Sequence, residues 1–155
     1  MNLDIEKIIR EYIDKTIHMS LGTSRDNKPW VCEVHFGYDQ SLNLYFVSLP
    51  ETRHCSEITV NPQVAGNIVK QHDLTESPKG IYFEGTATVL DAPTTEEIES
   101  YCTRLNRDIA ELSEKLSEAG GHRMYKIAVE NWYAFGKFGT EKNAKHELAW
   151  NGGKR

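Results

Sequence analysis

Hydrophobic and polar residues alternate through the middle of the chain with a period of two, which predicts antiparallel β-structure. In segment 30–39 the even positions are apolar or aromatic, whereas the odd positions include charged groups. Segment 42–48 repeats the alternation after a short polar turn, and its period places Tyr45 and Val47 on the outward face. The two segments therefore predict a β-hairpin with one face in the core.

The same period recurs in other segments and brings the number of predicted strands to six. The other four strands are predicted at residues 18–23, 63–70, 80–90 and 124–139. One domain is expected to span residues 1–139, because no repeat or linker interrupts this order. The polar residues 140–155 are predicted to form a mobile tail that is anchored by Trp150.

Two segments have the 3.6-residue period of an amphipathic helix, namely residues 3–13 and 94–119. Thr94 and Glu97 form a capping-box pattern at the start of the second segment, and residues 106–108 are a candidate break within it. An apolar stripe of this kind serves either ordinary packing or recognition of a partner, and packing is the commoner role.

The loop after segment 42–48 carries Thr52-Arg53-His54 directly before an apolar helical segment that ends at Val60. A guanidinium fork, a hydroxyl and the free amides of a helix start together suit a phosphate group. The alternative is that Thr52 merely caps the helix and that Arg53 is a solvated surface charge.

The order of strand, turn, strand, Thr52-Arg53-His54 and helix resembles the FMN-binding split-barrel family, to which the pyridoxamine 5'-phosphate oxidases belong. The resemblance implies a mainly β fold with α-helices (α+β): a six-stranded antiparallel split β-barrel with flanking helices. It also implies FMN as the cofactor and a homodimer, because the flavin of this family lies in a groove where two barrels meet. The cofactor-binding residues implied by the resemblance are Val31, Cys32, Glu33, Val34, His35, Phe36, Val47, Ser48, Thr52, Arg53 and His54.

Two positions depart from the family pattern. The family commonly has Lys where this chain has His54, and it often has a Gln early in its fifth strand, where residues 79–82 contain none. Both departures remove groups that would bind the phosphate and the ribityl chain.

Glu33 and His35 are the candidate acid and base, because residues two apart on a strand point the same way, about 6.6 Å from one another. The alternative is a solvated or interface pair on the polar face. Cys32 and His35 lie on opposite faces of the same strand, which excludes a thiol–imidazole dyad. The six histidines show no metal-binding spacing, so no metal site is expected.

Composition limits the remaining function classes. The net charge of −5 over 155 residues argues against nucleic-acid binding, and no apolar run approaches the length of a membrane span. Cys32, Cys55 and Cys102 form an odd, widely spaced set, which favours reduced thiols in the cytoplasm. We therefore expect a cytoplasmic FMN-dependent oxidoreductase that acts on an unknown small molecule. A non-catalytic flavin or heme carrier and a dimeric structural module without a cofactor are the alternatives.

Overall fold

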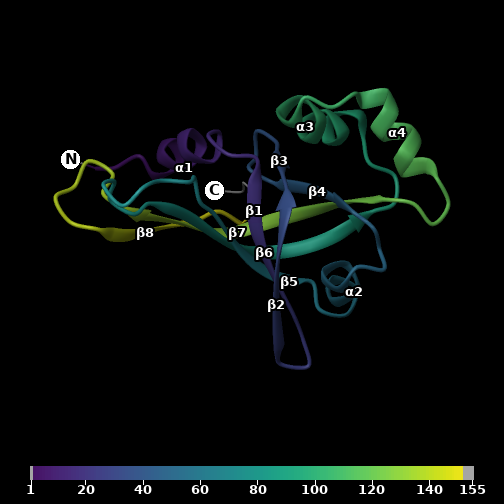
Figure 1. The fold of residues 1–155 in the computed structure, drawn as a ribbon, viewed down its shortest axis with the longest axis horizontal. Helices are drawn as coiled ribbons and strands as arrows, with labels where there is room; N and C mark the ends of the chain where they lie inside the picture. The colour runs from purple at the N-terminus through teal and green to yellow at the C-terminus, as the bar shows by residue number, and fades with distance from the viewer. Residues whose placement is uncertain (1, 152–155) are drawn as a thin grey trace.

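The computed structural model describes residues 2–151, which form a curved antiparallel sheet with four helices around it (Figure 1). The strands follow the order β2-β1-β5-β6-β7-β4-β3, and β8 pairs with β7. The predicted antiparallel split barrel is confirmed, but it has eight strands within the described residues where the sequence predicts six. Their bounds are β1 (His18–Arg25), β2 (Lys28–His35), β3 (Gly37–Tyr38), β4 (Leu44–Ser48), β5 (Gln63–Ile68), β6 (Gly80–Leu90), β7 (Arg123–Gly136) and β8 (Ala144–Ala149).

The helices begin and end close to the predicted positions. Their bounds are α1 (Ile5–Ile13), α2 (Arg53–Val60), α3 (Thr95–Leu105) and α4 (Ile109–Ser117). Thr94 and Glu97 form the predicted capping box at the start of α3, and Asn106 ends α3 in the left-handed conformation at φ 52°. The segment 94–119 is therefore divided at the predicted break. No helix within residues 2–151 combines the length and the apolar character that crossing a membrane requires.

The main core fills the concave side of the sheet and is covered by α1, which packs on β6, β7 and β8 (Figure 1). Its largest fully buried side chains include Trp132, Phe36 and Phe46. Leu44 and Phe46 of β4 point into this core, as the strand period predicts.

A second apolar cluster lies on the other face of β4 and β7, beneath α3 and α4. Tyr45 is only 1% exposed there and packs with Tyr101, Cys102 and Met124. The prediction that Tyr45 faces outward to solvent is therefore wrong, although its place on the opposite face from Phe46 is right. Strand periodicity separates two faces but does not show that a distant helical segment covers the second one.

The long predicted strand 30–39 is broken after β2. Gly37 and Tyr38 form β3, which pairs with β4 instead of continuing along β1. A Cβ on Gly37 would lie 2.4 Å from the carbonyl oxygen of Ser100. The absent side chain at Gly37 thus allows α3 to approach β3 closely.

Residues 144–149 differ from the predicted mobile tail, because they form β8 along residues 131–136 of β7. The predicted anchor is confirmed: Trp150 is 4% exposed, and its Nε1 donates to the Ser41 carbonyl at 2.7 Å. Polar residues dominate this segment because one face of β8 is exposed, and alternation over six residues is easily missed in a polar background.

Candidate functional site

A cavity of about 480 Å³ lies where β2, β4 and the start of α2 approach the segment 101–122. The residues from the predicted site that line it are Glu33, Val34, His35, Val47, Ser48 and His54. Sequence reasoning missed several other lining residues, because they come from distant segments that no local pattern connects to β2. These are His18, Tyr101, Arg107, Leu112, Lys115 and His122.

Two histidines face each other across β1 and β2. His18 and His35 are register partners, and their Nε2 atoms are 3.2 Å apart. Burial lowers the pKa of His35, and the neighbouring His18 and Arg107 lower it further against an opposing effect of Glu33. His35 is therefore held neutral at pH 7, in a state that can accept a proton.

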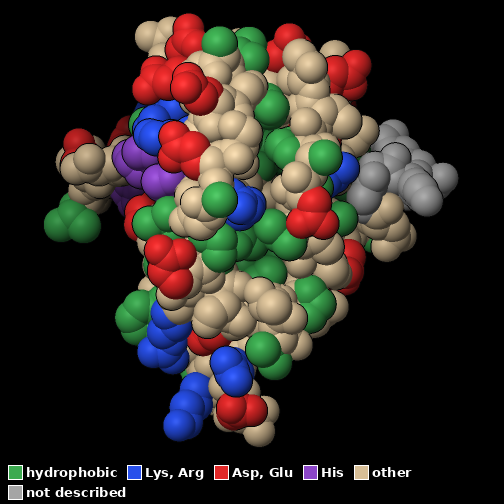
Figure 2. All heavy atoms as spheres, turned by 90° about the vertical axis from the view of Figure 1, so that its right-hand side faces the viewer, with side chains coloured by type: hydrophobic (Ala, Val, Ile, Leu, Met, Phe, Trp, Pro, Cys, Tyr) green, Lys and Arg blue, Asp and Glu red, His purple; other side chains and the backbone are tan. Residues whose placement is uncertain are grey.

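Glu33 lies on the same face of β2 as His35, as the strand period predicts, and both line the cavity. The hydroxyl of Ser20 donates to Glu33 Oε2 at 3.0 Å. Figure 2 shows histidine side chains gathered beside Lys and Arg side chains on this side of the molecule. The fixed charges of the lining are Arg107 and Lys115 against the one carboxylate of Glu33, so the cavity favours an anionic ligand.

The first turn of α2 forms one edge of the cavity. His54 is buried, and its Nε2 lies 2.9 Å from Ser48 Oγ and 3.4 Å from Thr52 Oγ1. Burial lowers the pKa of His54. The hydroxyl of Thr52 donates to the Leu49 carbonyl at 2.8 Å and makes no capping bond to α2. Thr52 is thus not a simple side-chain cap.

Arg53 does not line the cavity and instead contacts Glu57 and Trp30. Its Nε donates to Glu57 Oε2 at 3.3 Å, and its guanidinium carbon lies 4.2 Å from the ring centre of Trp30. The Glu57 side chain is only 5% exposed, whereas the Arg53 side chain is 48% exposed. Arg53 is therefore neither a purely solvated charge nor, in this arrangement, a wall of the cavity.

The model of one family, described as pyridoxamine 5'-phosphate oxidase, matches residues 5–136. The chain belongs to this family. The match covers the chain from α1 to the end of β7, all of the sheet except β8, and includes every predicted site residue.

Relatives of this family member include a UPF0306 protein from Photorhabdus laumondii, 28% identical over 106 residues, which cover 67% of this chain and 74% of the relative. Among solved structures, a heme binding protein from Mycobacterium smegmatis is similar with a TM-score of 0.75 at 13% identity; the match covers 98% of this chain but only 60% of that protein. A FAD-binding protein from Mesorhizobium loti has a TM-score of 0.62 at 16% identity, with 85% of this chain and 92% of that one covered. The structural likenesses show the shared fold.

The remaining residues that the family resemblance implies lie outside the cavity of this pyridoxamine 5'-phosphate oxidase family member. Phe36 is fully buried in the core, whereas Val31 is 63% exposed. Burial, with smaller contributions from Cys55 and Glu33, raises the pKa of Cys32 to about 11, so its thiol stays protonated. Val31 and Cys32 belong to β2, whose outer edge has no strand partner within residues 2–151.

Proposed function

We propose that this chain binds FMN in the cavity between β2, β4 and α2. The observation that carries the proposal is the convergence of Glu33, Val34, His35, Val47, Ser48 and His54 on one cavity that distant basic residues complete. Its volume of about 480 Å³ falls in the range of small-molecule and cofactor sites, roughly 300 to 1,000 Å³.

The phosphate would lie at the first turn of α2. The Thr52 side chain leaves the first-turn amides without a cap bond, and helix amides of this kind favour an anion. Arg53 is half-exposed in the same turn and can offer its fork by turning from Glu57. Arg107 and Lys115 line the cavity and add positive charge where the family's usual Lys is replaced by His54.

The flavin ring would lie against Val34 and Val47, and backbone groups of β2 would meet its polar edge. When bound, FMN supplies hydride or electron transfer, and the protein supplies orientation and charge around the ring. Neutral His35 would accept a proton from the substrate, with Glu33 beside it as the neighbouring anion. The proposed activity is therefore that of an FMN-dependent oxidoreductase acting on a small molecule.

A homodimer, which the family resemblance implies, is part of the proposal. The free edge of β2 carries Trp30 and Val31, which are 39% and 63% exposed. A second copy would cover this edge, since exposed apolar edge strands favour association. Sedimentation of the purified protein at micromolar concentration tests this, and a monomeric mass would contradict it. The free thiols of Cys32, Cys55 and Cys102 support a cytoplasmic location.

Titration with FMN and with riboflavin, followed by flavin fluorescence, tests the cofactor. We expect 1:1 binding of FMN and at least tenfold weaker binding of riboflavin, because charge-assisted bonds to the phosphate are worth about 1.5 kcal/mol or more. Lys115→Gln should weaken FMN binding, whereas Lys28→Gln, at an exposed position in the β1–β2 hairpin, is the matched control. Equal affinities for FMN and riboflavin would contradict the phosphate site.

Heme is the second candidate, and a specific observation favours it. His18, His35 and His122 bring three imidazoles to the same cavity, and imidazole is a common iron ligand in heme proteins. The visible spectrum of the purified protein, followed by mass identification of the released cofactor, separates the two candidates. Flavin release supports the first proposal, and an intense heme band that is lost in His35→Ala supports the second.

A further inference from the structure

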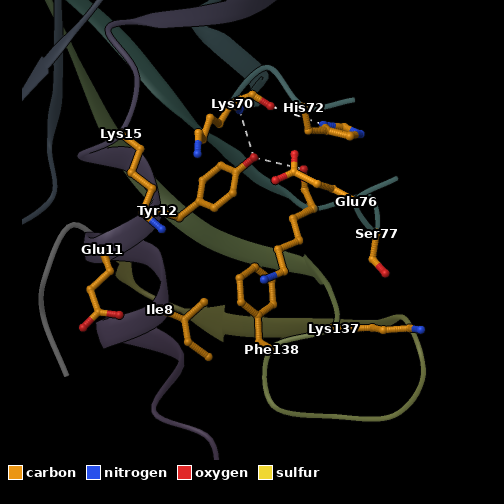
Figure 3. A pocket seen from close by; sticks show the side chains of 11 residues that line it. Ile8, Glu11, Tyr12, Lys15, Lys70, His72, Glu76, Ser77, Lys137 and Phe138 are labelled. Carbon is orange, nitrogen blue, oxygen red and sulfur yellow. Dashed lines mark hydrogen bonds between the residues drawn. The ribbon is translucent and has the colours of Figure 1, made fainter. Parts of the chain in front are cut away.

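A second cavity of about 550 Å³ lies between α1, the segment 70–79 that joins β5 to β6, and the turn after β7 (Figure 3). It shares no lining residue with the candidate FMN cavity. Three segments that are far apart in the sequence thus line one cavity, which takes no part in the candidate FMN site.

Lysines dominate the charge of this second cavity. Lys15, Lys70, Lys79 and Lys137 line it, against the carboxylates of only Glu11 and Glu76. None of these four ammonium groups forms an ion pair with another residue in the range 2–151, whereas Glu11 is paired with Lys7. The lining carries an excess of positive charge although the whole chain has a net charge of −5. Unpaired cations around one cavity attract an anionic ligand.

Tyr12 holds the lysine-bearing backbone in place. This side chain is 6% exposed; its hydroxyl accepts from the backbone N–H of Lys70 at 2.9 Å and donates to the carbonyl of Lys79 at 3.0 Å. The backbone of both lysines is thereby fixed at one wall, although their segments are otherwise irregular. Figure 3 shows Lys15 and Lys70 on the same side of the Tyr12 ring, away from Phe138, whereas Lys137 points away from the cavity.

The opposite wall is apolar and aromatic. The Phe138 ring lies edge-on to Tyr12 with ring centres 6.4 Å apart, and the Lys79 ammonium lies 5.0 Å from the centre of the Phe138 ring. Gly136 brings this turn against Lys79: its φ is +136°, and a Cβ there would lie 2.7 Å from Lys79 Cγ. An aromatic face beside a group of ammonium ions suits a planar ring that carries phosphate.

We propose that this second cavity binds a nucleoside diphosphate or a similar organic diphosphate, with its phosphates on Lys15, Lys70 and Lys79 and its planar ring against Phe138. The three ammonium groups, opposed by the carboxylate of Glu76, leave a net positive charge of about +2 for the phosphates of the ligand. The site is separate from the candidate FMN cavity, so it can be occupied together with it.

Calorimetric titration with ADP, pyrophosphate and adenosine tests the proposal on the full chain. We expect ADP to bind 1:1, pyrophosphate to bind more weakly because it lacks the ring, and adenosine to bind weakest because it lacks the phosphates. The double variant Lys15→Gln/Lys79→Gln should weaken ADP binding by about tenfold or more, since it removes two charge-assisted contacts. Phe138→Leu should weaken ADP but leave pyrophosphate unchanged.

Two controls assign the binding to this cavity. Lys28→Gln should leave ADP affinity unchanged, and Lys115→Gln should weaken FMN but not ADP. Protein saturated with FMN should still bind ADP with the same stoichiometry. The altered lysines are exposed, so unchanged thermal midpoints are expected and show that each variant is folded.

The outcomes separate this site from the proposed FMN function. Loss of ADP binding in the lysine double variant supports the second site even if FMN does not bind at all. Failure of ADP to bind, equal ADP affinity in the double variant and wild type, or displacement of ADP by FMN overturns it.

Discussion

Arg53 connects the stability of the fold to the proposed phosphate site, and its removal tests both. Its guanidinium donates to Glu57, whose side chain is 5% exposed, and it stacks on Trp30 at 4.2 Å. The hydroxyl of Thr23 donates to the other oxygen of Glu57 at 3.3 Å. In Arg53→Ala the Thr23 hydroxyl would be the remaining side-chain hydrogen-bond partner of this buried carboxylate within residues 2–151.

The expected cost follows from the exposure of the two partners. Breaking a fully buried ion pair costs about 3 to 5 kcal/mol, whereas an exposed pair contributes about 1 kcal/mol or less. Because Glu57 is buried but Arg53 is 48% exposed, we expect about 1 to 2 kcal/mol from the ion pair. The contact with Trp30 adds about 0.5 kcal/mol. A total near 2 kcal/mol lowers the midpoint by about 4 to 8 °C in a chain of this size.

Urea unfolding of the ligand-free protein measures this cost. Arg53→Lys should recover part of the loss, because the charge returns without the planar group that stacks on Trp30. Glu57→Gln and the double variant complete a cycle, and their coupling energy isolates the pair from the rest of the fold. If Arg53→Ala has the same free energy of unfolding as wild type, the ion pair contributes nothing and this reasoning is refuted.

The same variants test the phosphate site. FMN should raise the unfolding midpoint of wild type most, that of Arg53→Lys less and that of Arg53→Ala least, through the link between affinity and stability. Removal of one charge-assisted contact predicts about ten- to a hundredfold weaker FMN binding in Arg53→Ala. Equal FMN-induced shifts in the three proteins would exclude Arg53 from the site and leave it a purely structural role with Glu57.

Three further predictions concern the fold and the cavity. Trp150→Ala should lower the free energy of unfolding by about 3 kcal/mol, because it empties a site that is 4% exposed; urea unfolding measures this, and a loss below 1 kcal/mol would contradict the anchoring of β8. Burial lowers the pKa of His54 below 6.5, so the contribution of His54 to stability is present above pH 6.5 and is lost as the pH falls through the lowered pKa. The urea midpoint of His54→Gln should therefore decline less than that of wild type between pH 7.5 and 5. An equal decline in the two proteins would contradict this. Gly37→Ala places a Cβ 2.4 Å from the Ser100 carbonyl oxygen and should therefore shift α3. Hydrogen exchange of the α3 amides measures this shift, and exchange rates equal to those of wild type would refute it.

The local elements of this fold follow from the sequence because their patterns are local. The bounds of β6 agree with the predicted segment 80–90, and the capping box at Thr94 and Glu97 forms as predicted. The division of the second helical segment follows from Asn106, a residue that tolerates the left-handed conformation observed there. Two-residue and 3.6-residue periods thus suffice wherever neighbours in the chain determine the structure.

The candidate site was less accessible to sequence reasoning, because half of its wall comes from distant segments. Glu33, His35 and Ser48 lie where the hairpin pattern places them. Arg107 and Lys115 belong to a segment whose pattern indicates only packing, and His18 joins the site through its register with His35. No local periodicity specifies which strand lies next to which, so this part of the site required the tertiary structure.

Arg104 shows how the distant wall acquires its position. Its guanidinium forms an ion pair with Asp14 at 2.7 Å and donates to the carbonyls of Ile13, the last residue of α1, and of Thr16. It also lies over the rings of Phe36 and Tyr38, at 4.9 and 5.0 Å from their centres. One side chain near the end of α3 therefore connects the helical segment to the end of α1, to Phe36 after β2 and to Tyr38 of β3. Arg107 lies just past Asn106, the left-handed residue that ends α3, and its backbone N–H donates to the Cys102 carbonyl at 2.9 Å, so the contacts that fix the end of α3 also place Arg107 in the cavity wall with His35. Arg104 helps to shape the cavity but does not line it. A search for residues that could touch a ligand therefore does not find the residues that position the cavity wall.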